Sequence, residues 1–283
     1  MFYLCRRSPR RRPKRNRALA LGLALSLSAL VGAGAPASAR PLDEILDAKS
    51  LNICVQEDNL PFSSAQAKPR GVFLDLGAAI AERLGVEAKY TWLFSAEYVR
   101  KTDCDLIPAV ANLPGDDPIR LTIPYMAVRS VLVLAKDHPP VKELDELRTG
   151  HIAVLATSWA RHVLNAAGFP LWVRFLTNDE ILDAVAKGEA DAGIVPLPAY
   201  QWRMRRDAGA PLRVDEAVKL DPGFNFQVSM GLRRANAATV ARINEILGQM
   251  MEDGSIERIF ARYGLAYEPP AIVANPESGA AAK

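Results

Sequence analysis

Few of the acidic residues and histidines in this sequence stand where they suggest acid–base catalysis. Asp58 and Glu97 are the two carboxylates that a cleft could shelter, and a catalytic carboxylate needs such a place to acquire a shifted pKa. The three histidines, His138, His151 and His162, are scattered without metal-ligand spacing, and no nucleophile is paired with a base. The sequence therefore predicts a protein that is not an enzyme and holds no metal or cofactor.

Other side chains are better suited to binding than to catalysis. Thr157 and Ser158 precede a predicted helix, whose first N–H groups are free and favour an anion. Ser158 fits equally well as the N-cap of that helix, and the sequence leaves both roles open. Trp92 and Trp159 could line a cleft, the second because it follows Ser158 directly.

The first 39 residues have the composition of an export signal. A basic stretch is followed by an apolar run over residues 18–31 and by Ala37-Ser38-Ala39, which is typical of a cleavage site. We expect cleavage after Ala39, which makes residues 1–39 a signal peptide and places the mature chain in the periplasm. The alternative is an uncleaved membrane anchor, because the apolar run is near the shortest length that spans a bilayer.

The charge balance changes when this segment is set aside. The 283-residue chain carries 35 basic and 32 acidic residues, a net charge of +3. Eight of the basic residues and none of the acidic ones lie in residues 1–39, so the remainder carries a net charge of −5. A mildly acidic chain lacks the basic face that a nucleic-acid partner requires, and we expect no such partner.

Cys54 and Cys104 remain after the expected cleavage. An exported chain meets an oxidising compartment, so the two could form a disulfide. Two buried free thiols are the alternative, because cysteines inside strands often lack the geometry for a bridge. The sequence leaves both alternatives open.

The elements that must position these residues alternate between strands and helices, which implies parallel sheets covered by helices. Phe73, Leu76, Ile80 and Leu84 recur at helical spacing, and Gly85 ends that helix. Asn178 is expected to cap a later helix. The predicted strands cover residues 51–55, 88–93, 104–110, 129–136, 152–156, 172–176, 191–195 and 224–232. The other predicted helices cover 158–167, 178–188, 200–206, a stretch from residue 240 that Gly254 breaks, and a final short helix over 256–263.

Several short motifs resemble, in their order and spacing, the family 3 extracellular solute-binding proteins over roughly residues 49–266. The motifs are Asn59-Leu60-Pro61-Phe62, Asp75-Leu76, Cys104-Asp105-Leu106-Ile107, Thr122-Ile123-Pro124-Tyr125, Gly188-Glu189-Ala190-Asp191-Ala192 and Asp253-Gly254-Ser255-Ile256. The resemblance implies an α/β fold of the type II periplasmic binding protein class, in which two parallel-sheet lobes are joined by two hinge strands. Lobe I would then comprise residues 40–132 and 226–267, lobe II residues 133–225, and residues 268–283 a disordered tail.

The resemblance also implies a ligand site in the cleft between the lobes. In the family an Arg and an Asp hold the carboxylate and the ammonium of an amino acid. The matching positions here are Gly115 and Pro196, so the usual charge pair is expected to be missing. The residues expected to bind a ligand are Asp58, Asn59, Phe62, Trp92, Asn112, Thr157, Ser158, Trp159 and Tyr200.

A second set of segments is similar to a narrower branch of that family, the accessory proteins associated with methanol dehydrogenase and other PQQ-dependent quinoprotein dehydrogenases. These segments include residues 98–102, Cys104-Asp105 and residues 228–234, of which the last is the most specific. This resemblance implies a periplasmic PQQ dehydrogenase as partner. The alternative is a substrate-binding component that delivers a small polar solute to the membrane subunits of an ABC importer.

Overall fold

The computed structural model describes residues 40–94, 96–111, 119–156, 158–218, 220, 224–233 and 235–271. The predicted signal peptide and most of the predicted tail lie outside these ranges, as do Asn112, Gly115 and Thr157. Across the ranges described, the helices are too short or too polar to cross a membrane.

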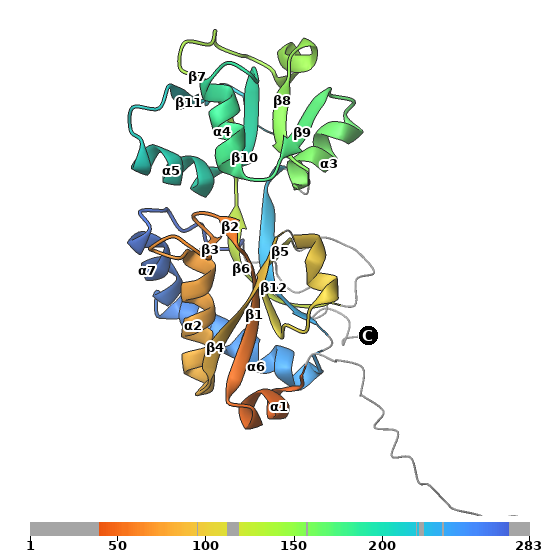
Figure 1. Cartoon of the computed structure of the whole chain (residues 1–283), viewed down its shortest axis with the longest axis vertical. Helices are drawn as coiled ribbons and strands as arrows, with labels where there is room; N and C mark the ends of the chain where they lie inside the picture. The colour runs from red at the N-terminus through yellow and green to blue at the C-terminus, as the bar shows by residue number, and fades with distance from the viewer. Residues whose placement is uncertain are drawn as a thin grey trace, which may run out of the picture. The chain divides into compact units, whose positions relative to one another are not determined.

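The first lobe is built on a five-stranded sheet with the order β4-β1-β5-β12-β6 (Figure 1). A two-stranded hairpin, β2–β3, follows its strand β1. The elements of this lobe are α1 (Leu42–Asp47), β1 (Ser50–Gln56), β2 (Asp58–Asn59), β3 (Ser63–Ser64), α2 (Val72–Leu84), β4 (Glu87–Leu93), the 3-10 helix η1 (Ala96–Lys101), β5 (Leu106–Ala111), β6 (Ile119–Val128), β12 (Phe226–Arg233), α6 (Ala237–Glu252) and α7 (Ser255–Arg262).

The second lobe is built on another five-stranded sheet, with the order β11-β7-β10-β8-β9. All its strands come from one continuous stretch of the chain. Its elements are β7 (Ser130–Ala135), the 3-10 helix η2 (Leu144–Thr149), β8 (Ile152–Leu155), α3 (Trp159–Ala166), β9 (Leu171–Phe175), α4 (Asn178–Ala186), β10 (Ala192–Pro196), α5 (Leu197–Arg206) and β11 (Leu212–Val214).

The two-lobed α/β architecture is confirmed, but the expectation of purely parallel sheets is wrong. In the first sheet β1 runs parallel to β4 and β5, whereas β12 runs antiparallel to both β5 and β6. In the second sheet β7 runs antiparallel to β10 and β11. The reversed strands are those through which the chain leaves one lobe and returns to it, and such passages are not the helical crossovers that produce parallel pairs.

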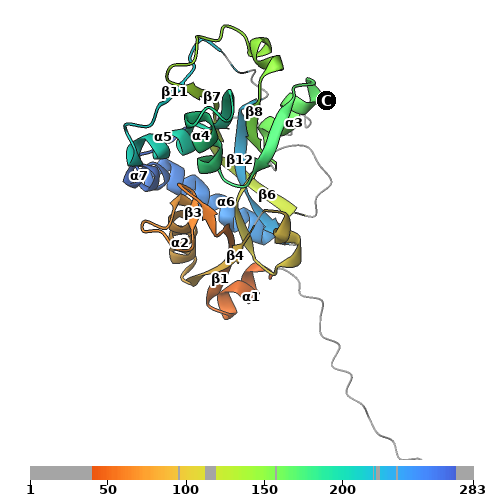
Figure 2. The same cartoon turned by 45° about the horizontal axis from the view of Figure 1, so that its top comes forward.

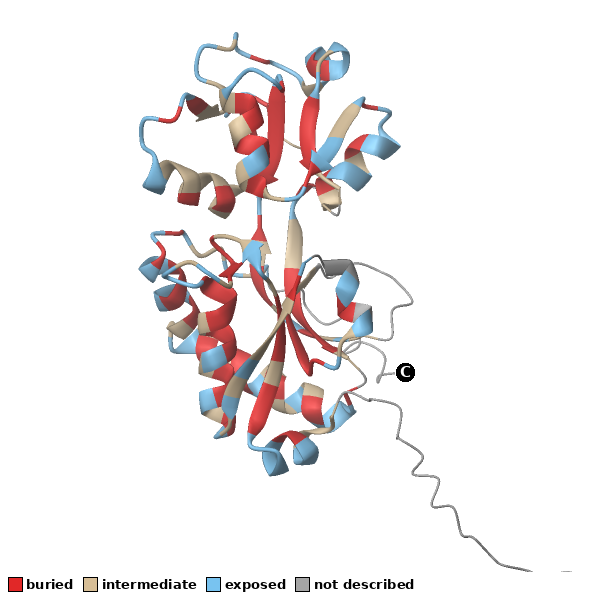
Figure 3. Ribbon diagram, viewed as in Figure 1, coloured by how far each residue is buried: buried red, intermediate tan, exposed pale blue. Residues whose placement is uncertain are grey.

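Helix α2 shows how the sequence pattern positions the first lobe. Phe73, Leu76, Ile80 and Leu84 are all buried, and Gly85 ends the helix with φ 72°, a left-handed conformation that suits glycine. Figures 1 and 2 both show α2 beside α7. Figure 3 shows that burial concentrates in the strands of both sheets and on the sheet-facing sides of the helices. The predicted periodicity therefore marks the face that packs on the sheet.

The start of α4 differs from the prediction that Asn178 is its cap. Thr177 is the N-cap, and its side chain accepts a hydrogen bond from the backbone N–H of Glu180. The Glu180 carboxylate accepts the backbone N–H of Thr177 in return, which completes a capping box. Asn178 is instead the first helical residue and is buried.

The chain passes from the first sheet to the second at Arg129, slightly before the predicted boundary at residue 132. β6 ends at Val128, and β7 already pairs with β10 of the second sheet from Ser130 onward. The backbone carbonyl of Arg129 accepts the N–H of Leu197 at 2.8 Å, and its guanidinium lies 3.5 Å from the carboxylate of Glu268. The start of the predicted tail is thus fixed beside the passage between the lobes.

Candidate ligand-binding site

A cavity of about 420 Å³ lies between loops of the two lobes. On the first-lobe side, the lining comes from the end of β1, the β2–β3 hairpin and the end of β4. On the second-lobe side, it comes from the end of β9 and the first turn of α4. The lining residues are Glu57, Asp58, Ser64, Ala65, Gln66, Phe94, Leu176, Thr177 and Glu180.

Backbone hydrogen bonds fix the first-lobe wall of this cavity. The N–H of Glu57 donates to the carbonyl of Leu93 at 3.0 Å, and the carbonyl of Glu57 accepts the N–H of Ala65 at 2.9 Å. In the hairpin, Asp58 lies opposite Ser64. These bonds hold the carboxylate-bearing segment while leaving the side chains of Glu57 and Asp58 exposed.

The second-lobe wall is the capped start of α4. The Glu180 carboxylate accepts the backbone N–H of Leu176 at 2.7 Å in addition to that of Thr177. Glu180 is thus held in place, and its negative charge compensates the positive end of the helix. Leu176 is 62% exposed and Phe94, on the opposite wall, is 66% exposed. The cavity therefore combines carboxylates with two uncovered apolar side chains.

The predicted ligand residues divide between this cavity and the protein interior. Asp58 lines the cavity, whereas Asn59 lies beside it and donates from Nδ2 to Gln56 Oε1 at 2.8 Å. Phe62 is buried in the core and stacks on Phe73 with ring centroids 5.0 Å apart. The Phe62 ring is thus occupied by core packing.

The predicted aromatic residues also have partners outside the cavity lining. Trp92 lies under the guanidinium of Arg70 at 5.1 Å, and Trp159 stacks on His162 at 5.4 Å. Tyr200 packs against the core of the second lobe, and burial raises the pKa of its hydroxyl.

Ser158 occupies the cap position that the sequence allowed. Its hydroxyl accepts the N–H of Arg161 at 3.2 Å and donates to the carbonyl of Leu155 at 2.8 Å. Asn112 and Thr157, the other predicted ligand residues, lie outside the described residues. Two positions were expected to carry the family's charge pair for amino acids. Gly115 also lies outside the described residues, and Pro196 ends β10 opposite Ser130. Proline offers no charge to an ammonium group.

Cys54 and Cys104 are joined by a disulfide with their Cα atoms 5.6 Å apart. Both residues are buried, in a small cluster with Leu93, Val99 and Ile107. The bond links β1, whose end carries part of the first-lobe wall of the cavity, to the segment that leads into β5.

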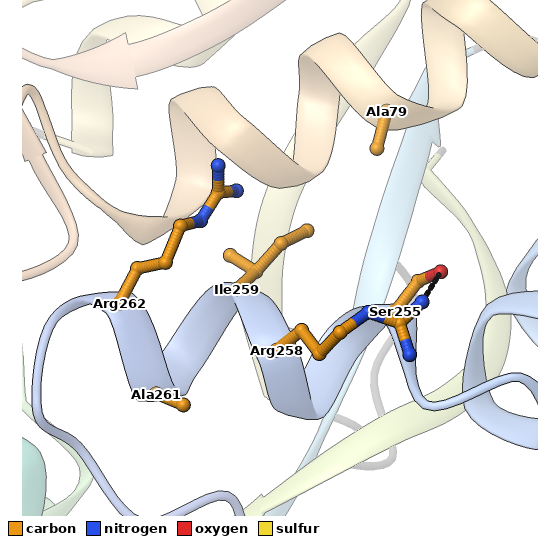
Figure 4. A pocket seen from close by; sticks show the side chains of 6 residues that line it. All are labelled: Ala79, Ser255, Arg258, Ile259, Ala261 and Arg262. Atoms are coloured by element: carbon orange, nitrogen blue, oxygen red, sulfur yellow. Dashed lines mark hydrogen bonds between the residues drawn. The ribbon is translucent and has the colours of Figure 1, made fainter.

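A second, larger depression of about 650 Å³ lies between α2 and α7. Figure 4 shows Arg258 and Arg262 on α7 beside Ala79 of α2. The Arg258 guanidinium donates to Ser255 Oγ at 2.9 Å, and that of Arg262 lies 3.1 Å from the Asp75 carboxylate. The predicted ligand residues do not include any that line it.

Asp58 and Glu97 are the two carboxylates considered for acid–base chemistry. Asp58 lines the cavity, but the side chain of Glu97 lies outside the part of the chain that is described. Within that part, no group of three or more His, Cys, Asp or Glu side chains is arranged to hold a metal ion. The lining can bind a solute through charge and apolar contact.

Two lobes on mixed sheets with a cavity between them define a periplasmic binding protein of type II. The model of the bacterial extracellular solute-binding proteins, family 3, matches residues 51–266, and the chain belongs to this family. The chain is 27% identical over 218 residues to the lysine/arginine/ornithine-binding periplasmic protein of Escherichia coli (strain K12), a match that covers 72% of this chain and 83% of the relative.

Solved structures agree with this fold. The ancestral amino acid-binding protein AncCDT-1, described as a precursor of cyclohexadienyl dehydratase, superposes with a TM-score of 0.66 at 21% identity, covering 78% of this chain and 98% of that protein. Tv2483 bound to L-arginine gives a TM-score of 0.65 at 19% identity, covering 80% and 95%. These likenesses establish the architecture, and the family itself consists of solute-binding proteins.

Proposed function

We propose that this chain captures a small organic cation in the cavity between its lobes. The proposal rests on the residues that line the cavity. They include three carboxylates, Glu57, Asp58 and Glu180, and none of the nine lining residues is Lys or Arg. Carboxylates form charge-assisted hydrogen bonds with ammonium and guanidinium groups. Phe94 and Leu176 add apolar surface for the carbon body of such a solute.

The names of relatives support a basic solute. One relative is named for binding lysine, arginine and ornithine, and a structure of similar fold holds L-arginine. In this chain Pro196 stands where the family's ammonium-binding Asp is expected. We therefore expect the basic group to be held by Glu57 and Asp58 instead, with Glu180 already committed to the cap of α4.

We further propose that the chain is exported by its N-terminal signal and delivers its solute to the membrane subunits of an ABC importer. This role follows from the family and from the predicted signal peptide at residues 1–39. The proposed ligand site does not depend on the identity of that partner.

The test is a calorimetric titration of the chain beginning at Arg40 with L-arginine, L-ornithine, putrescine, L-glutamate and succinate. Basic solutes should bind, and Asp58→Asn should weaken them about tenfold through loss of one charge-assisted contact. Glu82→Gln is the matched control, because Glu82 is an exposed carboxylate of α2 away from the cavity. Binding of the acidic solutes alone, or equal effects of the two variants, would contradict the proposal.

A second candidate function is that of an accessory protein for a periplasmic PQQ-dependent dehydrogenase. The observation that favours it is the convergence of the segments that resemble this branch. Arg233 at the end of β12 donates from Nη1 to the carbonyls of Val99, at 3.0 Å, and Thr102. Thr102 in turn lies 3.1 Å from the sulfur of Cys54, so these segments form one compact corner of the first lobe.

This candidate has its own experiment. A strain lacking the chain should lose methanol or alcohol oxidation by its quinoprotein dehydrogenase, and the tagged chain should co-purify with that enzyme from the periplasm. Arg233→Ala tests the corner itself, because it removes both hydrogen bonds that Nη1 donates to the carbonyls of Val99 and Thr102. Full oxidation activity in the deletion strain would refute the accessory role and leave the solute-binding proposal untouched.

A further inference from the structure

Asp105 is a buried carboxylate that the ligand site does not use. It is 3% exposed and lies next to Cys104, immediately before β5. Its backbone N–H donates to the carbonyl of Asn52 at 2.8 Å, and its Oδ2 accepts the N–H of Asn52 at 2.8 Å. A buried carboxylate requires a cation and further donors to offset its desolvation.

The cation is supplied by Arg40, the first described residue. Its Nη2 lies 2.7 Å from Asp105 Oδ2, and its Nε lies 3.2 Å from Oδ1. The same Nη2 also donates to the carbonyl of Ser50 at 2.8 Å. The hydrogen bond with Asp105 raises the pKa of the Arg40 guanidinium, with Glu44 adding a weaker attraction. The side chain of Arg40 thus forms an ion pair with both oxygens of the Asp105 carboxylate.

The main-chain nitrogen of Arg40 also faces the carboxylate of Asp105. It is 3.5 Å from Asp105 Oδ1, at the limit of a hydrogen bond. Arg40 is also the residue that cleavage after Ala39 would leave at the start of the chain. While the peptide bond is intact, this nitrogen is a neutral amide with one N–H to donate.

We propose that Asp105 is a preformed receptor for the new N-terminal ammonium of Arg40. Removal of the signal peptide then completes a site in which the buried Asp105 carboxylate holds both the ammonium and the guanidinium of Arg40. Hydrolysis by a signal peptidase consumes one water, leaves a carboxylate on Ala39 and an amine on Arg40, and the amine takes up a proton. The resulting ammonium gains a full charge and two more donors toward Asp105 Oδ1.

This contact links processing to the stability of the first lobe. Asp105 connects the start of β1 to the start of β5, and the adjacent Cys104 forms the disulfide to Cys54. We expect the processed chain to be more stable than any chain that continues past Arg40 toward the N-terminus, with Tm higher by about 2–4 °C.

The experiment begins with N-terminal sequencing of the chain recovered from the periplasm, which should start at Arg40. A chain released from a fusion with Arg40 as its first residue is then compared by calorimetry with two blocked forms, one retaining Ala39 and one acetylated at Arg40. Both blocked forms should melt lower by the stated interval. In Arg40→Ala the difference between free and acetylated ends should persist, because the ammonium remains.

Asp105→Asn is the matched control, since the free and blocked forms of that variant should melt together. If that variant does not fold, the reactivity of the N-terminal amine in the unsubstituted protein serves in its place. Held by Asp105, the amine should acylate about tenfold more slowly at pH 7 than the amine of a peptide covering residues 40–45, because the ammonium form is favoured. A different first residue, equal Tm values for free and blocked forms, or a peptide-like acylation rate would overturn the proposal.

Discussion

Removal of the disulfide should destabilise the first lobe strongly. The bond joins Cys54 and Cys104, which are 50 residues apart, so it closes a long loop in the unfolded chain. For a loop of that length the chain-entropy relation gives about 4 kcal/mol at 25 °C. In a domain of this size such a loss lowers Tm by about 8–16 °C.

The perturbation is the double variant Cys54→Ala, Cys104→Ala in the chain beginning at Arg40. Thr102 Oγ1 lies beside both sulfurs, but it also donates to the carbonyl of Val99 at 2.8 Å, so the substitution leaves that hydroxyl with a partner. The measured change should therefore report the lost covalent link together with the small cavities left by two sulfur atoms.

Scanning calorimetry with and without a reducing thiol is the assay. Reductant should lower the Tm of the unsubstituted chain toward that of the double variant, and it should leave the variant unchanged. Two titratable thiols in the denatured, unreduced chain would refute the reasoning. An unchanged Tm in the double variant would refute it as well.

Four further substitutions test other parts of the fold. Gly71→Ala should lower the free energy of unfolding, measured by urea denaturation, by about 2 kcal/mol or more, because Gly71 has φ 120° and an added Cβ would lie 2.4 Å from the carbonyl oxygen of Phe62. Gly85→Ala is the control: Gly85 has φ 72° but open space around it, so this substitution should cost about 1 kcal/mol. Tyr263→Phe should cost about 1–2 kcal/mol in the same assay, since the hydroxyl accepts the N–H of Gly71 at 3.0 Å in a buried position. Asp215 is buried, which would raise its pKa, but hydrogen bonds from a neighbouring guanidinium and backbone N–H groups lower that pKa on balance below 3.8. Its stabilising contribution is present above the unfolded pKa and is lost as the pH falls through the folded one, so Asp215→Asn should lower stability at pH 7 and flatten the decline below about pH 4, as followed by denaturation at a series of pH values.

The sequence predicted the elements better than the cavity. The helix over residues 73–84 and its end at Gly85 follow from local periodicity and from one glycine, and both signals survive in the structure. The antiparallel course of β7 and β12 was missed, because strand direction depends on where the chain crosses between lobes and not on any local pattern.

The cavity lining was only partly predictable. Asp58 was identified because it follows the first strand, whereas Phe94, Leu176 and Glu180 were not. These residues come from segments of different lobes, and their proximity is set by tertiary packing alone. One local signal was available, since Thr177 followed by Glu180 three residues later matches a capping box and would have located the start of α4. Phe62 was expected in the site because its motif follows the first strand, but its ring is buried against Phe73.

The strand order of the first sheet has a consequence for the sequence of events during export. β12 lies between β5 and β6, so one interior strand of that sheet is supplied by residues near the end of the chain. Every strand of the second sheet, in contrast, lies between residues 130 and 214. A chain that emerges from its N-terminus thus delivers the whole second lobe while the first sheet still has an open slot. In pulse-labelling hydrogen exchange during refolding, where the whole chain is present from the start, we expect amides of β8 and β10 to gain protection before those of β5 and β6, because the shared partner β12 is distant from β5 and β6 in the sequence.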